Sequence, residues 1–352
     1  MAAGPPPHSQ TSLQAGPRAS LPRRSPLGPP GTPPRSLRHI RTKHQCSALR
    51  FCPFPQETGS RVALATSQHF GIVGNGELLI VDVNALGVSP VASFDTLEGI
   101  FDCAWSEQTP FLVVIGGGGG ACKLYDIRAQ DGRPLREYRA HSDDISSVDW
   151  NLVTGNEFLS SSWDGCIGVW DPMRSVSPIQ YIRAHSTLAY AAVWSPVSPR
   201  VLASVGGEGS LKVWDLNEPS RPAMDIAAHD NEVLTVDWNK YDPSLLITGS
   251  VDRLLRVWDI RSPHQPMITL HGHKFGVRKV KFSPHRDSVV VSAGYDMTTL
   301  VWDLAHSAPL LQAFDHHSEF VVGLDFDLFV PDQLGTCGWD ARACFFQTPA
   351  LL

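Results

Sequence analysis

The sequence repeats itself with a period of 44 or 45 residues. Five copies of an aromatic residue followed by Asp keep this spacing, at Tyr125-Asp126, Trp170-Asp171, Trp214-Asp215, Trp258-Asp259 and Trp302-Asp303. Histidines 44 residues apart form a second series in the same register, at His141, His185, His229, His273 and His317. One step back from the first marker falls on Val81 and one step beyond the last falls on Phe346, which gives seven units. A repeat of this length is a supersecondary unit that buries its apolar faces only against its neighbours.

Each unit contains four short runs in which apolar residues alternate with others. In the third unit these are Val148–Trp150, Glu157–Ser160, Cys166–Trp170 and Ile179–Arg183, with turn residues between them. Four short strands per 44 residues is typical of a β-propeller blade. The His and Trp-Asp markers resemble those of WD40 repeats, so the predicted fold is an all-β, seven-bladed WD40 propeller over residues 35–352.

Units three to seven share a set of four side chains. Each His is followed after 19 residues by Ser or Thr, then four residues later by an acid and six later by an aromatic ring. The sets are His141/Ser160/Asp164/Trp170, His185/Ser204/Glu208/Trp214, His229/Thr248/Asp252/Trp258, His273/Ser292/Asp296/Trp302 and His317/Thr336/Asp340/Phe346. The resemblance to WD40 repeats implies a hydrogen-bonded chain within each blade. Ser, His and Asp also form hydrolase triads, but a catalytic site occurs once and this set recurs, so we interpret it as structural.

Four units depart from this set. Units one and two lack the His, and the Phe346 ring cannot donate a hydrogen bond. Glu208 is expected to be one methylene too long for its turn. The first two blades are therefore predicted to be the least rigid.

The two ends of the repeat array have signatures of their own. Residues 1–34 contain ten prolines and no acidic residue, which predicts a disordered tail, with an Arg- and Ser-rich organellar transit peptide as the alternative. Unit seven stops soon after its third strand, so its outer strand is missing. Arg35–Arg41 is the predicted donor of that strand, which would close the ring and remove an open sheet edge.

Charge and composition exclude several classes of function. Residues 1–50 carry eight Lys and Arg and no acid, whereas the other 302 residues have a net charge of −14, which disfavours nucleic acid and suits a basic peptide. The seven cysteines show no metal-ligand spacing, which indicates reduced thiols in the cytosol. No apolar run approaches the roughly 18 residues of a membrane helix, so no membrane insertion is expected. Gly116–Gly120 falls at a turn rather than in a phosphate loop. We therefore predict a binding protein without catalytic residues, cofactor or metal.

Two kinds of position are expected to line one end of the central channel, namely the residue before the turn acid and the loop residues that lead into the innermost strand. The apolar members are predicted to form an exposed ring, at Phe101, Trp163, Leu188, Tyr190, Leu234, Tyr295, Phe320 and Trp339. An acidic rim with few bases nearby is predicted at Asp95, Glu98, Asp143, Asp144, Glu232 and Glu319, and of these Asp95, Glu98, Asp144 and Glu232 are the predicted peptide-binding acids. An apolar centre with an acidic rim suits an amphipathic helix that carries basic residues. A second protein that clamps the helix would help, because short helices are marginal alone.

Several segments that depart from the generic repeat resemble one family. They are Ser67–Gly71, Phe94–Glu107, Ser161–Asp164, Val236–Tyr241, His316–Phe320 and Gly338–Asp340, and together they resemble the WD40-repeat receptors for the type-2 peroxisomal targeting signal, the seventh-peroxin family. The resemblance implies a receptor that cycles between cytoplasm and peroxisome and binds an N-terminal, helical nonapeptide of cargo such as thiolase. It also implies a co-receptor peroxin and the peroxisomal docking complex as partners. The acids would then pair with the basic end of the signal, and the apolar side chains would hold its leucines.

One alternative function stays open at this stage. Trp258-Asp259-Ile260-Arg261 matches the pattern of propellers that act as substrate adaptors of cullin ubiquitin ligases, and Tyr125-Asp126-Ile127-Arg128 is a weaker copy of it. An ordinary strand end with a surface Arg accounts for the same residues.

Overall fold

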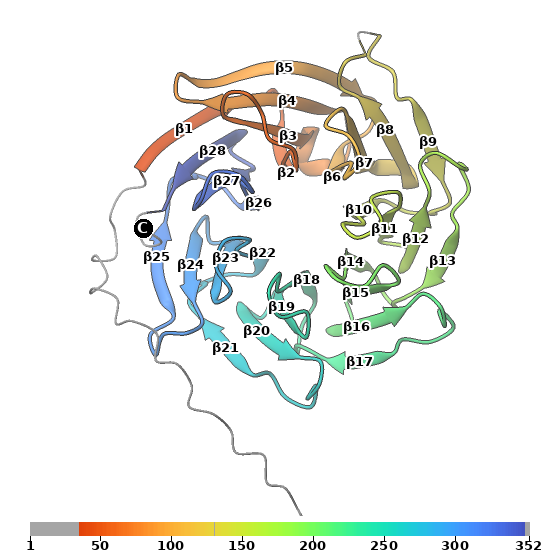
Figure 1. Cartoon of the computed structure of the whole chain (residues 1–352), viewed down its shortest axis with the longest axis vertical. Coiled ribbons are helices and arrows are strands. Elements are labelled where there is room, and N and C mark those ends of the chain that lie inside the picture. The colour runs from red at the N-terminus through yellow and green to blue at the C-terminus, as the bar shows by residue number, and fades with distance from the viewer. Residues whose placement is uncertain (1–34, 130, 349–352) are drawn as a thin grey trace, which may run out of the picture.

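The computed structural model describes residues 35–129 and 131–348, which form seven four-stranded antiparallel sheets arranged around a common axis (Figure 1). The predicted seven-bladed, all-β propeller is confirmed. The predicted tail, residues 1–34, lies outside the described residues, as do residues 349–352.

Six blades are built from four consecutive strands, the first of which lies innermost. Blade one comprises β2 (Gln45–Phe51), β3 (Ser60–Ser67), β4 (Gly76–Asn84) and β5 (Gly87–Thr96). Blade two comprises β6 (Ile100–Trp105), β7 (Leu112–Gly117), β8 (Ala121–Asp126) and β9 (Arg136–Arg139). Blade three comprises β10 (Ile145–Trp150), β11 (Phe158–Ser162), β12 (Cys166–Trp170) and β13 (Gln180–Arg183). Blade four comprises β14 (Ala189–Trp194), β15 (Val201–Gly206), β16 (Ser210–Asp215) and β17 (Met224–Ala227). Blade five comprises β18 (Val233–Trp238), β19 (Leu245–Ser250), β20 (Leu254–Asp259) and β21 (Ile268–His271). Blade six comprises β22 (Val277–Phe282), β23 (Val289–Gly294), β24 (Thr299–Asp303) and β25 (Leu310–Phe314). Two short 3-10 turns, η1 (Gln68–Gly71) and η2 (Gly118–Gly120), replace the simple turn between the second and third strands of the first two blades.

The N-terminal strand closes the ring. Blade seven comprises β26 (Val321–Phe326), β27 (Gln333–Gly338), β28 (Arg342–Gln347) and, as its outer strand, β1 (Arg35–Arg41). The β1–β28 pairing is antiparallel, with His39 opposite Cys344 and Ile40 opposite Ala343. The predicted closure is therefore confirmed, and it covers the hydrogen-bonding edge that β28 would otherwise expose.

Adjacent blades pack face to face, so most strands are buried on both sides. Val114 and Leu124 of blade two, for example, share one apolar cluster with Val148, Trp150 and Phe158 of blade three. β11 and β12 are buried along their whole length, which explains why their sequences are nearly continuous apolar or small-residue runs.

The repeated set of four side chains forms the expected hydrogen-bonded chain. In blade three, Trp170 Nε1 donates to Ser160 Oγ at 2.9 Å, and the two nitrogens of His141 lie 2.8 Å from Ser160 Oγ and 3.1 Å from Asp164 Oδ2. The same chain occurs in blades four, five and six. It ties the loop between blades to the inner turn, which is a structural role.

The expectation that Glu208 is too long was wrong. His185 Nδ1 lies 2.7 Å from Glu208 Oε1, and Thr187 Oγ1 donates to Glu208 Oε2 at 2.9 Å. The longer side chain fits because Gly206 leaves space beside it, where a Cβ atom would lie only 2.7 Å from Glu208 Oε2.

In blade seven a second His stands beside Thr336, where blades three to six have the indole N–H. Phe346 cannot donate, but the neighbouring His316 places its Nε2 atom 3.1 Å from Thr336 Oγ1 and packs its ring on Phe346 at 4.8 Å between centroids. In blades one and two no His stands at the repeated position, and Thr66 and Thr96 bond to main-chain groups instead. The lower rigidity of these two blades stays a prediction.

Candidate peptide-binding face

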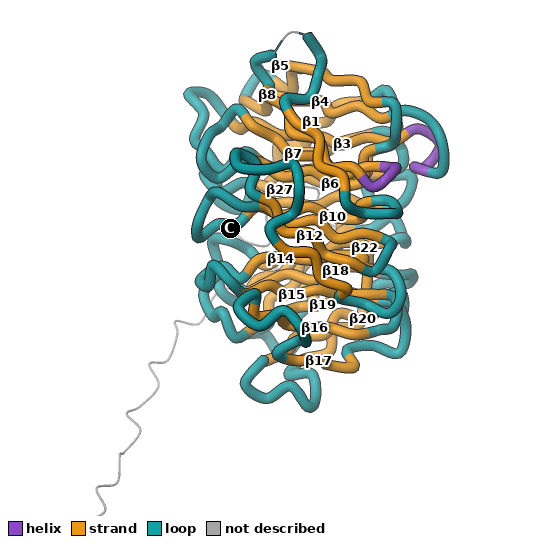
Figure 2. The backbone as a smooth tube through the Cα atoms, turned by 90° about the vertical axis from the view of Figure 1, so that its right-hand side faces the viewer, coloured by secondary structure: helices purple, strands orange, loops and turns teal. Residues whose placement is uncertain are grey.

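The two kinds of position predicted to line one end of the channel are joined by a backbone hydrogen bond that recurs in six blades. The N–H group just before the turn acid donates to a carbonyl in the loop that enters the innermost strand. The pairs are Gly118 to Gly99 at 3.0 Å, Trp163 to Asp144 at 3.0 Å, Gly207 to Leu188 at 2.9 Å, Val251 to Glu232 at 3.1 Å, Tyr295 to Gly276 at 2.9 Å and Trp339 to Phe320 at 3.0 Å. Because all blades have the same orientation about the axis, these residues share one face, which we call the upper face. Figure 2 shows η1 and η2, in purple, on the same side of the disc.

Six aromatic side chains form two contacting groups on the upper face. In blades six and seven, Tyr295, Phe320 and Trp339 contact one another with ring centroids 4.9 to 6.4 Å apart. Phe70 of blade one packs on Trp339 at 4.9 Å, and Phe101 of blade two packs on Trp163 of blade three at 5.5 Å. We call these six residues the aromatic band. It extends over five of the seven blades.

The loop around Gly71 joins the two halves of the band. Phe70 and Gly71 have φ values of 61° and 82°, which turn the Phe70 ring toward blade seven. A Cβ atom on Gly71 would overlap the Phe101 ring, so the main chain here touches that aromatic directly. Only glycine tolerates both this conformation and this close approach.

Phe70 is the member that sequence reasoning missed. The longer loop of unit one moves it out of register with the repeat, so no counting rule reaches it. The signal that could have found it is the irregular segment Ser67–Gly71, which stood out only as a mark of resemblance.

The aromatic ring is less open than expected. Of the band, only Phe70, at 49% exposed, keeps much of its surface, because the others lie against one another. Leu234, predicted to be exposed, is 5% exposed, which corrects that expectation. Trp163 Nε1 is buried and has no hydrogen-bond partner within the described part of the chain.

Leu188 and Tyr190 lie in blade four on the same face and are half-buried. Tyr190 Oη donates to Glu232 across the blade boundary at 3.0 Å. Burial, followed by this hydrogen bond, raises the pKa of Tyr190, and Tyr295 adds to the shift. Tyr190 therefore ties blade four to the Glu232 carboxylate at the start of blade five.

The acidic rim divides into paired and unpaired carboxylates. Lys43 bonds to Asp95 at 3.1 Å and Lys123 bonds to Glu98 at 2.8 Å, so the expectation of few bases nearby was wrong for these two acids. Asp144 accepts a hydrogen bond from the Gly119 N–H at 2.9 Å, and Glu232 accepts that of Tyr190. Among the described residues, neither Asp144 nor Glu232 has a cation within ion-pair distance.

The two arginines of the adaptor pattern are engaged locally. Arg261 forks onto Asp259, with Nε and Nη2 at 2.9 and 2.7 Å from its oxygens, and Arg128 forks onto Asp126 in the same way. Such forks are an ordinary strand-end feature, so the geometry gives the ubiquitin-ligase alternative no specific support.

A possible metal cluster also proves to be structural. The donor atoms of His316, His317 and Cys344 lie within 4.8 Å of one another. Both ring nitrogens of His317 are, however, engaged by Asp340 and Thr336, at 3.0 Å each.

In the described part of the chain, no helix is long and apolar enough to cross a membrane.

Comparison with known proteins defines first the class and then the relatives. The WD40 model (WD domain, G-beta repeat) matches residues 132–171, 176–215, 220–259 and 264–303, so these four segments are WD40 repeats within the seven-bladed β-propeller. It is similar to the "Peroxisomal targeting signal 2 receptor" of Dictyostelium discoideum, with 43% identity over 126 residues, which is 36% of this chain and 39% of the relative. The Homo sapiens receptor of the same name is 40% identical over 126 residues, 36% of this chain and 38% of the relative. "Peroxisome biogenesis protein 7" of Arabidopsis thaliana is 40% identical over 133 residues, 37% of this chain and 41% of the relative.

These similarities confirm the predicted resemblance to type-2 peroxisomal targeting signal receptors. The aligned segment spans about two fifths of the length of these relatives.

Proposed function

We propose that this protein is a receptor that binds a type-2 peroxisomal targeting signal, an N-terminal nonapeptide folded as an amphipathic helix, on its upper face. The observation that carries the proposal is the aromatic band beside two carboxylates, Asp144 and Glu232, that lack a cation partner among the described residues. The names of the relatives support it, because they are called receptors for this signal.

The band suits the apolar stripe of such a helix. Its rings form a half-buried surface that leucine side chains would cover, and burial of apolar surface contributes about 25 cal/mol per Å². The indole N–H of Trp163 is buried and has no partner among the described residues, which costs roughly 1–3 kcal/mol until a small shift of the ring brings it to an acceptor. We propose that an oxygen of the bound signal accepts this hydrogen bond. The signal thus removes a penalty that the free receptor carries.

The carboxylates suit the basic end of the signal. Asp144 and Glu232 are free to pair with Arg or Lys, whereas Asp95 and Glu98 would first have to release Lys43 and Lys123. We therefore assign the main electrostatic role to Asp144 and Glu232, and a secondary role to Asp95 and Glu98.

A nonapeptide helix is marginally stable in water, since isolated helices shorter than about 12 residues seldom persist. We propose that a co-receptor peroxin covers the side of the helix that faces away from the propeller. The complex with cargo such as thiolase would then pass from the cytoplasm to the peroxisomal docking complex and into the matrix. The proposed role is binding and delivery, without a catalytic step.

Peptide binding tests the proposal directly. A fluorescein-labelled nonapeptide with a basic residue and Leu at one end, and His or Gln and Leu at the other, is titrated with the full chain plus co-receptor, and the anisotropy is followed. Asp144→Lys and Glu232→Lys should each weaken binding about 10-fold or more, and salt should weaken it further. Glu218→Lys, on an exposed loop between β16 and β17, makes the same change of charge and should leave the affinity unchanged. Equal affinity in all three variants would contradict the electrostatic model.

A further inference from the structure

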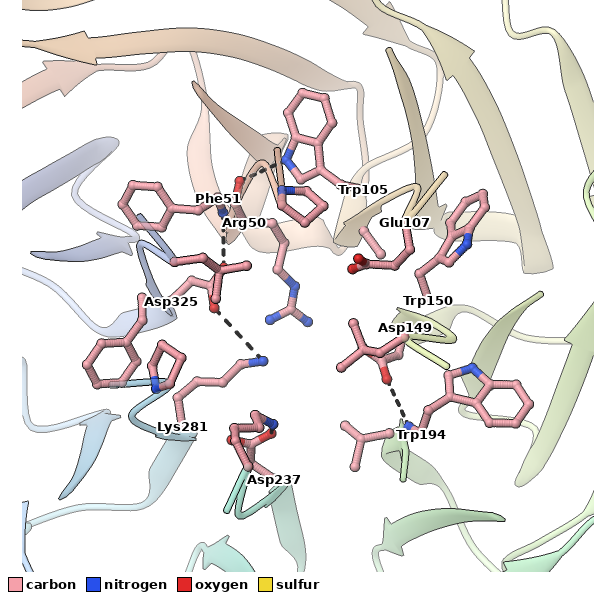
Figure 3. Close-up of a pocket in the computed structure, with 18 of the residues that line it drawn as sticks. Arg50, Phe51, Trp105, Glu107, Asp149, Trp150, Trp194, Asp237, Lys281 and Asp325 are labelled. Atoms are coloured by element: carbon pink, nitrogen blue, oxygen red, sulfur yellow. Dashed lines mark hydrogen bonds and ion pairs between the residues drawn. The ribbon is translucent and has the colours of Figure 1, made fainter. Parts of the chain in front are cut away.

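The opposite end of the molecule holds a second recess. Each innermost strand runs from the upper face to the other end, which we call the lower face. The loops that follow these strands surround a recess that is open to solvent. Three indoles form part of its wall, from Trp105, Trp150 and Trp194. Figure 3 shows Arg50, Glu107, Asp149 and Lys281, each from a different blade, projecting toward its centre.

Most charges around the recess are paired. Arg50 bonds to Asp102 at 3.2 Å, Lys240 to Asp237 at 2.9 Å, and Lys281 lies 3.9 Å from Asp325. Lys279 lies 3.9 Å from Asp102 as well, so four cations and five carboxylates surround the recess. Two of the carboxylates remain outside these pairs.

Glu107 and Asp149 have no cation within ion-pair distance in the described part of the chain. Asp149 accepts a hydrogen bond from the main-chain N–H of Trp194 at 2.8 Å. Burial raises the pKa of Glu107 to about 7, with Asp149 and Asp325 adding to the shift, and burial also raises the pKa of Asp149. The recess therefore carries an excess of negative charge that a cationic group from outside would neutralise.

Arg50 supplies a complementary hydrogen-bond donor. Its Nε and Nη2 atoms are engaged by Cys103 and Asp102, but Nη1 is buried without a partner among the described residues. A ligand that satisfies the recess thus needs a cation for Glu107 and Asp149 together with an oxygen acceptor for Arg50. A Lys or Arg residue within a peptide carries both, because its own main-chain carbonyl lies beside its charged side chain.

An apolar rim surrounds the recess on the lower face. The loops after the innermost strands of blades three, four, five and seven expose six large side chains by 43 to 58%, namely Leu152, Val153, Val197, Tyr241, Leu328 and Phe329. Tyr241 is held in place by a hydrogen bond to the Pro284 carbonyl at 2.9 Å. Soluble proteins seldom leave such a cluster without a partner, and its location around the charged recess points to one ligand for both.

We propose that the lower face is a second protein-binding site, which takes a loop or chain end with Lys or Arg between apolar residues. The cation enters the recess between Glu107 and Asp149, its aliphatic stem lies along the indoles, and the flanking apolar residues cover the rim. A neighbouring carbonyl accepts from Arg50 Nη1. The site lies on the opposite end of the propeller from the aromatic band, so it does not depend on the proposed peptide receptor function.

Four pools of blocked, fluorescein-labelled pentapeptides test the site. They are random at the outer positions and carry Lys, Arg, norleucine or Glu at the centre, and binding to the full chain at pH 8 is followed by anisotropy and by tryptophan fluorescence. The Lys and Arg pools should bind at least 10-fold more tightly than the norleucine pool, and the Glu pool most weakly. Equal binding of the Lys and norleucine pools would overturn the proposal. So would binding of n-hexylamine as tight as that of the Lys pool, because that result would indicate a small-amine site.

Variants locate the binding on the lower face. Glu107→Gln and Asp149→Asn keep the size and hydrogen-bonding capacity of each side chain and should abolish the preference for Lys over norleucine. The targeting-signal nonapeptide should bind both variants normally, which separates the two sites. Asp144→Lys on the upper face should leave pentapeptide binding unchanged, and loss of that binding would move the ligand to the upper face and overturn the proposal.

Discussion

At the scale of single residues, the upper face depends on a position without a side chain. Gly71 has a φ of 82°, and its Cα lies against the Phe101 ring between the two halves of the aromatic band. The shape of the aromatic band therefore depends on the path of the main chain at Gly71 as well as on the aromatic side chains.

Gly71→Ala should disrupt that surface. The left-handed conformation costs a residue with a Cβ atom about 1–2 kcal/mol, and the added methyl group must also displace Phe101. We expect the nonapeptide affinity to fall at least 10-fold, measured by anisotropy. Gly132→Ala is the matched control, because Gly132 has a similar φ of 68° but no neighbouring atom within 4 Å. That variant should show the backbone strain in thermal unfolding while binding normally; equal loss of binding in both would refute a specific role for Gly71.

Glu107 couples the lower face to pH. Its pKa is about 7 in the folded protein against an ordinary 4.5, so the folded state holds the proton more tightly than the unfolded chain does. The group therefore lowers the free energy of unfolding progressively as the pH rises from about 4.5 to about 7.

Glu107→Gln should remove this loss. Urea unfolding should show nearly equal stability of the variant and the natural protein below pH 4.5, and a more stable variant at pH 8, by at most about 3 kcal/mol. Glu218→Gln, at an exposed loop, should show no such pH-dependent gain. A Glu107→Gln variant without any advantage at pH 8 would mean that the Glu107 carboxylate is well solvated.

At the scale of elements, β1 contributes more than its length suggests. Its seven residues pair along β28 and join the two ends of the chain in a single sheet. Without β1, one edge of β28 would have no hydrogen-bonded neighbour. Blade seven would also lose the strand that the chain joins directly to blade one.

Truncation separates this role from that of the preceding residues. Removal of residues 1–30 leaves β1 intact and should preserve the melting temperature. Removal of residues 1–41 deletes β1. It should lower the melting temperature, measured by calorimetry, by several degrees, or cause aggregation through the free edge, measured by light scattering. Identical melting of the two truncated chains would show that closure does not stabilise the ring.

At the scale of the whole molecule, the propeller presents two faces of different chemistry. The innermost strands are six or seven residues long, or about 20 Å, so ligands on the upper and lower faces cannot touch. The upper face combines aromatic rings with free carboxylates at its rim, whereas the lower face surrounds a buried charge excess with an aliphatic rim. A protein of this shape can hold two partners at once without competition.

The predicted fold followed closely from repetition. A 44-residue period repeated across the chain specifies each strand several times over, so local ambiguity at one blade is corrected by the others. The same redundancy predicted which residues share the upper face. Prediction from the repeat failed at two places. It missed Phe70, because the loop there departs from the repeat, and it was wrong for Glu208, because the space beside Gly206 lets the longer side chain fit.

The sequence alone determined the number of blades, the strands within each blade, the closing strand and the residues of the repeated hydrogen-bonded chain, because these depend on local pattern and regular spacing. Only the tertiary structure decided which aromatic rings touch, which acids are neutralised by Lys43 and Lys123, and which carboxylates and donors are left without partners. Those contacts join residues far apart along the chain, such as Phe70 and Trp339 across the ring closure, and pairwise distances between distant segments are fixed only when the whole ring packs.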